Sequence, residues 1–180
     1  MMGTGRHGFW RMPLLVRMLV YTVGFLGMVL IALPWAFHRI DIYLPAIRAE
    51  VGPFRILGAI FTTVSLALYL GASYVLTRRG KGAYAEFDPP TRLVIVGPYR
   101  YTRNPVAATL IATVLGEAIW FSSTGILLMF CAFVILARLQ VTRIEEPLLH
   151  RRYGRAYDDY CASVPRWIPR LRPRGRPAST

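Results

Sequence analysis

The feature that most constrains the fold is the separation of apolar and charged residues into alternating blocks. Apolar residues cluster at 18–37, 56–77, 106–121 and 124–137, and nearly all of the charge lies between these blocks. Because the first two blocks hold no charge over about 20 positions, each is long enough as a helix to cross a hydrocarbon core of roughly 30 Å. We therefore predict an all-α, polytopic membrane protein with about four transmembrane helices.

The third and fourth apolar blocks are shorter, and only Ser122 and Ser123 separate them. This spacing predicts a tight helical hairpin, in which either helix could instead be buried without spanning the bilayer. We expect one integral membrane domain over residues 1–180. Its expected parts are two transmembrane helices (12–76), a cytoplasmic motif loop (77–105), a helical hairpin (106–142), a cytoplasmic cofactor-binding segment (143–169) and a basic tail (170–180).

The basic residues indicate the orientation in the membrane. The chain has a formal net charge of +13, and its arginines flank the apolar blocks, a pattern that orients membrane proteins and does not indicate nucleic-acid binding. Arginine-rich segments precede the first block, separate the second from the third and follow the fourth. We expect these segments and both termini to be cytoplasmic, an arrangement compatible with a bacterial inner membrane.

The scattered cysteine and histidine residues exclude two kinds of site. The two cysteines, Cys131 and Cys161, and the three histidines, His7, His38 and His150, have no spacing suited to a metal ion. The sequence also lacks a Ser-His-Asp signature. We therefore place any chemistry in the two polar segments on the cytoplasmic side.

The second of these segments predicts an amphipathic cytoplasmic helix. Its residues Glu146, Leu149, Tyr153, Tyr157 and Tyr160 recur at spacings of three and four, which places them on one helical face. This face could pack on the membrane surface or contact a ligand. The preceding pair, Glu145 and Glu146, could neutralise nearby arginines or hold a hydroxyl pair or an ammonium group of a ligand.

Several motifs in the C-terminal half occur together in a recognisable order. They are Gly97-Pro98-Tyr99-Arg100-Tyr101-Thr102-Arg103-Asn104-Pro105, the apolar hairpin, Glu145-Glu146, Tyr153-Gly154-x-x-Tyr157-x-x-Tyr160 and Val164-Pro165-Arg166-x-x-Pro169. This order and spacing resemble the isoprenylcysteine carboxyl methyltransferase family and its phospholipid methyltransferase relatives. The resemblance implies an S-adenosylmethionine-dependent methyltransferase whose lipid-like or prenylated substrate enters from the bilayer.

The resemblance also suggests which residues form the site. The expected cofactor-binding residues are Tyr99, Arg100, Tyr101, Asn104, Pro105, Glu145, Glu146, Tyr153, Tyr157 and Arg166. The expected catalytic residues are Arg103, Asn104 and Glu146. Many family members have histidine where this chain has Asn104, and asparagine cannot act as a base near neutral pH.

The methyl acceptor stays open at this stage. A carboxylate acceptor would suit Arg103 or Arg100, because guanidinium binds carboxylate through two parallel hydrogen bonds. An amine acceptor could instead give its proton to Glu145 or Glu146. Gly97 is followed by Pro98 and Tyr99, so the motif lacks the glycine-x-glycine signature of the phospholipid branch. This disfavours phosphatidylethanolamine and leaves an isoprenylcysteine-type carboxylate as the expected acceptor.

Other functional classes also remain open. They are a phospholipid, amine or thiol methyltransferase, a membrane reductase that uses a nicotinamide cofactor, and a non-enzymatic membrane protein. The oligomeric state is not indicated by the sequence.

Overall fold

The computed structural model describes residues 13–44, 51–81 and 91–170, and the regular structure in these ranges is entirely helical. The α-helices are α2 (Leu14–Gly27), α3 (Leu33–His38), α4 (Arg55–Gly80), α5 (Pro105–Phe121), α6 (Thr124–Gln140), α7 (Glu146–Tyr153) and α8 (Arg155–Ser163). The π-helical stretches are η1 (Met28–Ala32) and η6 (Val141–Glu145), and the 3₁₀ helices are η2 (Arg39–Tyr43), η4 (Gly52–Phe54) and η5 (Gly97–Arg100). The predicted all-α class is confirmed.

Three continuous helical runs are long and apolar enough to cross a membrane. They cover Leu14–Tyr43, Gly52–Gly80 and Thr124–Tyr153, with 29 or 30 residues each. The expected fourth helix, α5, is apolar but has only 17 residues. It forms the first arm of the predicted hairpin, because Ser122 adopts a left-handed conformation (φ 49°) after α5 and α6 begins two residues later.

Two prolines explain the π-helical stretches in the first and last of these runs. Pro34 and Pro147 are the second residues after η1 and η6 respectively, and each is the second residue of the next α-helix. A proline inside a helix lacks an N–H group and clashes with the carbonyl four residues earlier. A π-helical turn before the proline lets the helical run continue past it.

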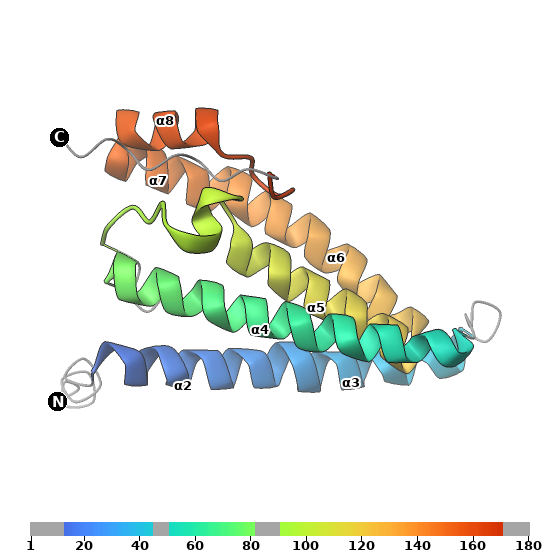
Figure 1. Ribbon diagram of the computed structural model, residues 1–180. Coiled ribbons are helices and arrows are strands. Elements are labelled where there is room, and N and C mark those ends of the chain that lie inside the picture. The colour runs from blue at the N-terminus through green and yellow to red at the C-terminus, as the bar shows by residue number, and fades with distance from the viewer. Residues whose placement is uncertain (1–12, 45–50, 82–90, 171–180) are drawn as a thin grey trace, which may run out of the picture.

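The helices converge at one end of the molecule and spread apart at the other (Figure 1). The start of α2, the end of α4 and the helices α7 and α8 all lie at the spread end. At the convergent end, Asp41 accepts a hydrogen bond of 2.6 Å from the backbone N–H of Gly125, in the first turn of α6. The hairpin tip is thereby fixed to the segment that follows α3.

The segment predicted as one amphipathic helix consists of two helices. η6 and α7 continue from α6 without interruption, and Gly154 then breaks the helix with φ 50° and ψ −130°, a conformation that suits only glycine. The prediction of a single helical face from Glu146 to Tyr160 was therefore wrong in its geometry. A chain reversal, not helical periodicity, brings Tyr157 and Tyr160 near the end of α7.

Close packing between α4 and α5 depends on two glycines. A Cβ atom on Gly116 would lie 2.3 Å from Oγ1 and 2.7 Å from the backbone N of Thr62, and one on Gly58 would lie 2.6 Å from the backbone N of Trp120. No side chain fits at either position unless the helix axes separate. This contact sets the distance between α4 and the helix that begins at the motif loop.

We predict that Gly116→Ala destabilises the protein by about 1–3 kcal/mol, because the added methyl group overpacks the contact with the backbone of Thr62. The measurement is thermal unfolding in detergent. Gly71→Ala in α4 is the matched control, because a Cβ at Gly71 meets no atom within 4 Å. Equal unfolding temperatures for the two variants would contradict the predicted role of Gly116.

Candidate active site

Residues 97–105, the last part of the predicted loop 77–105 and hereafter the motif loop, begin with a backbone conformation that favours glycine. Gly97 has φ 58° and opens the short helix η5, with Pro98 as its second residue. A Cβ at Gly97 would lie 3.6 Å from a methyl carbon of Val75, so the loop starts against the side of α4. The aromatic ring of Tyr99 then turns into the protein interior, where 6% of the residue is exposed.

The motif loop ends where Asn104 and Pro105 begin α5. Proline disfavours helical geometry at the residue before it, and Asn104 has φ −124° and ψ 57°, outside the helical region. The amide group of Asn104 does not cap α5. It donates a hydrogen bond of 3.1 Å to the backbone carbonyl of Arg166.

Residues 164–170, the C-terminal strap, lie along the motif loop and are hydrogen-bonded to it. The backbone N–H of Arg103 donates to the carbonyl of Pro165, and the N–H of Arg170 donates to the carbonyl of Tyr101. The buried hydroxyl of Thr102 is 3.0 Å and 3.2 Å from the carbonyl oxygens of two strap residues. Two segments about 60 residues apart in sequence thus form one unit.

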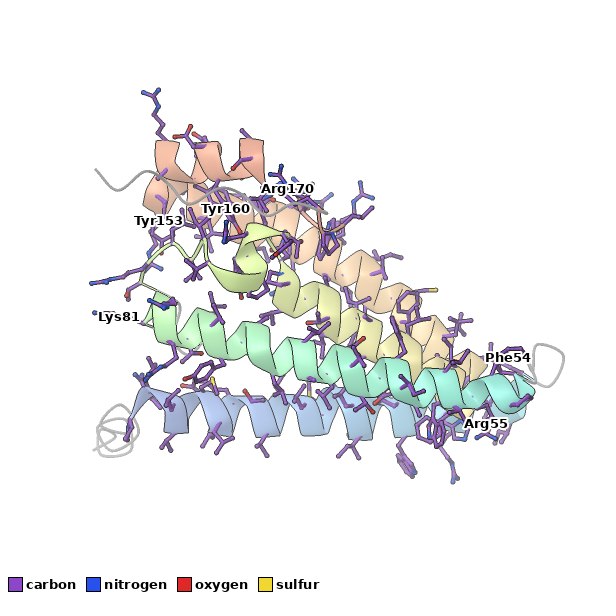
Figure 2. All side chains as sticks on the ribbon, in the orientation of Figure 1. Phe54, Arg55, Lys81, Tyr153, Tyr160 and Arg170 are labelled. Carbon is purple, nitrogen blue, oxygen red and sulfur yellow. The ribbon has the colours of Figure 1, made fainter. Side chains whose placement is uncertain are left out.

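An aromatic cluster supports this unit from the side of α8. Tyr157, Tyr160 and Val164 are buried together, and Tyr153 and Leu93 pack against them. The hydroxyl of Tyr160 donates a hydrogen bond of 2.7 Å to the carbonyl of Tyr99 in the motif loop. Figure 2 shows Tyr153 and Tyr160 at the same end of the molecule as the motif loop, far from Phe54 and Arg55 at the other end.

The charged centre of the site is a cluster of three side chains from three segments. Glu146 accepts hydrogen bonds from Nη1 of Arg103 at 2.9 Å and from Nε and Nη2 of Arg166 at 2.8 Å and 2.7 Å. The side chains of Arg103 and Glu146 are 11% and 17% exposed. The cluster carries two positive charges and one negative charge, so it can attract an anionic group. Glu146 raises the pKa of Arg166, which keeps that guanidinium charged.

One donor of the cluster remains available for a ligand. The Nε of Arg103 is buried and has no hydrogen-bond partner among the described residues. A buried donor without a partner carries a desolvation cost that an anionic acceptor can offset. Arg103 is therefore able to hold Glu146 through one nitrogen and a bound anion through another.

Tyr157 and Cys161 lie next to the charged cluster. Burial raises the pKa of Tyr157, and the neighbouring Cys161 and Glu146 raise it further, so its hydroxyl stays protonated. Nη1 of Arg103 contacts the sulfur of Cys161. Cys161 was not expected to have a role from the sequence, although it lies one helical turn after Tyr157, which is the signal that could have placed it here.

The structure brings most, but not all, of the predicted site residues together. Arg103, Glu146 and Arg166 meet directly. Asn104 bonds to the backbone of Arg166, and Tyr153 and Tyr157 belong to the aromatic cluster. Tyr99 joins that cluster through its carbonyl, and Pro105 begins α5. Glu145 lies outside the cluster, where its Oε1 is 3.3 Å from Nε2 of Gln140. The ring of Tyr101 is 38% exposed, and that residue joins the strap only through its carbonyl.

A comparison with protein families places the chain among methyltransferases. The model of the phospholipid methyltransferase family matches residues 50–156, which is more than half of the chain. The chain belongs to the phospholipid methyltransferase family. Membership implies a methyltransferase, and the three long apolar helices indicate an integral membrane protein. No curated protein and no solved structure matches the chain.

The extent of the family match is informative about the site. The matched region contains α4, the motif loop, the hairpin and α7, and it ends before Tyr157, Cys161 and Arg166. Arg103 and Glu146 therefore lie within the matched region. The remainder of the cluster comes from a part of the chain that the phospholipid methyltransferase model does not cover.

We predict that Thr102→Val loosens the C-terminal strap. The variant keeps the shape of the side chain but removes the hydroxyl that contacts the carbonyls of Arg166 and Trp167, at a cost of about 1–2 kcal/mol. Amide hydrogen exchange of residues 164–170 should become faster. Thr142→Val is the control, since its hydroxyl bonds only to carbonyls of its own helix. Unchanged strap exchange in Thr102→Val would contradict the prediction.

Proposed function

We propose that the protein transfers a methyl group from S-adenosylmethionine to the carboxylate of a lipid-like or prenylated acceptor. The observation that carries this proposal is the half-buried cluster of Arg103, Glu146 and Arg166, with its net positive charge and the unpartnered Nε of Arg103. Arginine matches the planar geometry of a carboxylate and binds it through two parallel hydrogen bonds. A phospholipid amine is the second candidate acceptor, because the matching family is named for phospholipids.

The residues of the site fit the cofactor chemically. S-adenosylmethionine carries hydroxyl and ammonium groups, and a carboxylate such as Glu146 can accept hydrogen bonds from them. Its adenine ring can stack on tyrosine rings. When bound, the cofactor supplies a methyl group on a positively charged sulfur. We assign cofactor contacts to Glu146, Tyr153, Tyr157 and the motif-loop side chains. Two nitrogens of Arg166 hold the carboxylate of Glu146 in one orientation.

In this proposal Arg103 lies between the cofactor and the methyl acceptor. Its Nη1 holds Glu146, and we assign its buried Nε, which no described residue satisfies, to the acceptor carboxylate. An in-line displacement depends chiefly on aligning the two reactants and excluding water. The strap and the aromatic cluster of Tyr157 and Tyr160 cover this region and serve both tasks.

The charged cluster offers no available base, which favours a carboxylate over an amine as the methyl acceptor. An ammonium acceptor must lose a proton before it can attack, whereas a carboxylate is already a nucleophile. Both oxygens of Glu146 accept hydrogen bonds from guanidinium groups, and Asn104 cannot take up a proton. Among the residues of the cluster, no other group has the basicity to replace them.

The position of the site suits an acceptor that enters from the bilayer. The cluster lies at the spread end of the helices, close to where the long apolar runs end. The arginines at this end lead us to propose that it faces the cytoplasm. A lipid-like molecule in that leaflet would present its polar group to the motif loop.

We predict that Glu146→Gln weakens S-adenosylmethionine binding about 10- to 150-fold, the equivalent of losing a charged hydrogen bond. The measurement is calorimetry on the protein in nanodiscs. Glu145→Gln is the matched control, because Glu145 lies outside the cluster. This variant should bind S-adenosylmethionine as tightly as the original protein. Unchanged cofactor affinity in a folded Glu146→Gln variant would remove the assignment. Binding of a reduced nicotinamide instead would support a reductase.

We predict that Arg103→Lys lowers kcat/KM for carboxylate acceptors by at least about tenfold, since lysine keeps the charge but loses the paired donors. Methyl esters release methanol in base whereas methylamines do not, so a vapour-diffusion assay identifies the acceptor atom. The panel should contain a prenylated cysteine, a fatty acid and phosphatidylethanolamine. Methylation of phosphatidylethanolamine alone, without loss in Arg103→Lys, would exclude the carboxylate proposal.

A further inference from the structure

A cavity lies beside the end of α4 at the spread end of the molecule, apart from the charged cluster. It has a volume of about 480 Å³, and Tyr74, Val75, Arg78 and Arg79 line it. None of these residues takes part in the cluster of Arg103, Glu146 and Arg166 or in the aromatic cluster of α8. The cavity therefore needs an explanation of its own.

The position of this cavity relative to the bilayer follows from the length of the helical run that contains α4. The run Gly52–Gly80 has 29 residues, which at 1.5 Å per residue gives about 43 Å. A bilayer including its headgroups is about 40–45 Å thick. A helix of this length ends in the headgroup layer on both sides, so Arg78 and Arg79 lie at the depth of lipid phosphates.

Arg78 and Arg79 give the cavity a positive charge that no described carboxylate neutralises. Neither arginine takes part in the ion pairs seen among the described residues. The carbonyl of Gly80 accepts hydrogen bonds from the backbone N–H groups of Thr91 and Arg92, which brings one more basic residue to the end of α4. An anionic ligand would find several donors and no opposing carboxylate among the described residues.

The lining residues also suit a ligand that is partly apolar. The guanidinium of Arg78 lies 5.9 Å from the centre of the Tyr74 ring, which restrains the charged group over an aromatic face. Val75 contributes an apolar wall. A phosphate attached to a glycerol and acyl chains matches this combination, and basic pockets of this kind at a membrane surface bind lipid headgroups.

We propose that this cavity binds the phosphate group of an anionic phospholipid, as a lipid site separate from the methyl acceptor site. Arg78 and Arg79 hold the phosphate, while Tyr74 and Val75 contact the start of the lipid tails. The same Val75 supports Gly97 at the start of the motif loop. A bound lipid therefore steadies the part of α4 against which the active-site loop rests.

The test measures lipid binding and does not depend on methyl transfer. Native mass spectrometry of the full-length protein, released from nanodiscs of phosphatidylglycerol and phosphatidylcholine, should show retained phosphatidylglycerol. The double variant Arg78→Gln/Arg79→Gln should retain about tenfold less, whereas Arg78→Lys/Arg79→Lys, which keeps the charge, should retain most of it. The control is Arg151→Gln/Arg155→Gln, an exposed basic pair on α7 and α8, which should match the original protein.

Three outcomes would overturn the proposal. Equal retention in the Arg78→Gln/Arg79→Gln variant would show that the lipid binds elsewhere. Equal loss in the control would show that only the general surface charge matters. Displacement of the lipid by millimolar glycerol 3-phosphate or inorganic phosphate would identify a soluble phosphate compound as the ligand, whereas resistance to both supports the membrane lipid.

Discussion

The site depends on one carboxylate, Glu146, which is held by two guanidinium groups. These groups come from the motif loop and the C-terminal strap, which lie 43 residues before and 20 residues after Glu146 in the sequence. The contacts are short, and the side chains of Arg103 and Glu146 are largely shielded from water, where charged hydrogen bonds are stronger than at an exposed surface. Removing Glu146 would leave two neighbouring guanidinium groups without the carboxylate that holds them together, so the three segments stabilise one another.

The surrounding architecture brings this carboxylate to the membrane surface. The last long helical run continues from α6 through the π-helical stretch η6 into α7, so Glu146 is carried on a rigid extension of a membrane helix. Pro147 accounts for the π-helical stretch directly before it. The close contact at Gly58 and Gly116 fixes α5 against α4, and α5 begins where the motif loop ends. Loop and carboxylate thus rest on helices whose spacing is set by packing.

The same end of the molecule contains two sites of different character. The cluster around Glu146 is enclosed by the strap and by tyrosines, which suits a reaction that requires alignment and the exclusion of water. The described lining residues of the cavity at Arg78 and Arg79 all belong to α4, and we propose that this cavity lies at headgroup depth and binds a lipid that is not transformed. Val75 lies between the two, since it lines the cavity and contacts the start of the motif loop.

The sequence by itself determined the helical class, the apolar runs, the hairpin and the identity of the main charged residues. These features are local, because apolar length, proline position and turn chemistry act over a few residues. The break at Gly154, the placement of Glu145 outside the cluster and the contact of Cys161 with Arg103 were decided only by the tertiary structure. Helical periodicity carries no information about a chain reversal, and it cannot tell which of two adjacent carboxylates faces two arginines distant in sequence.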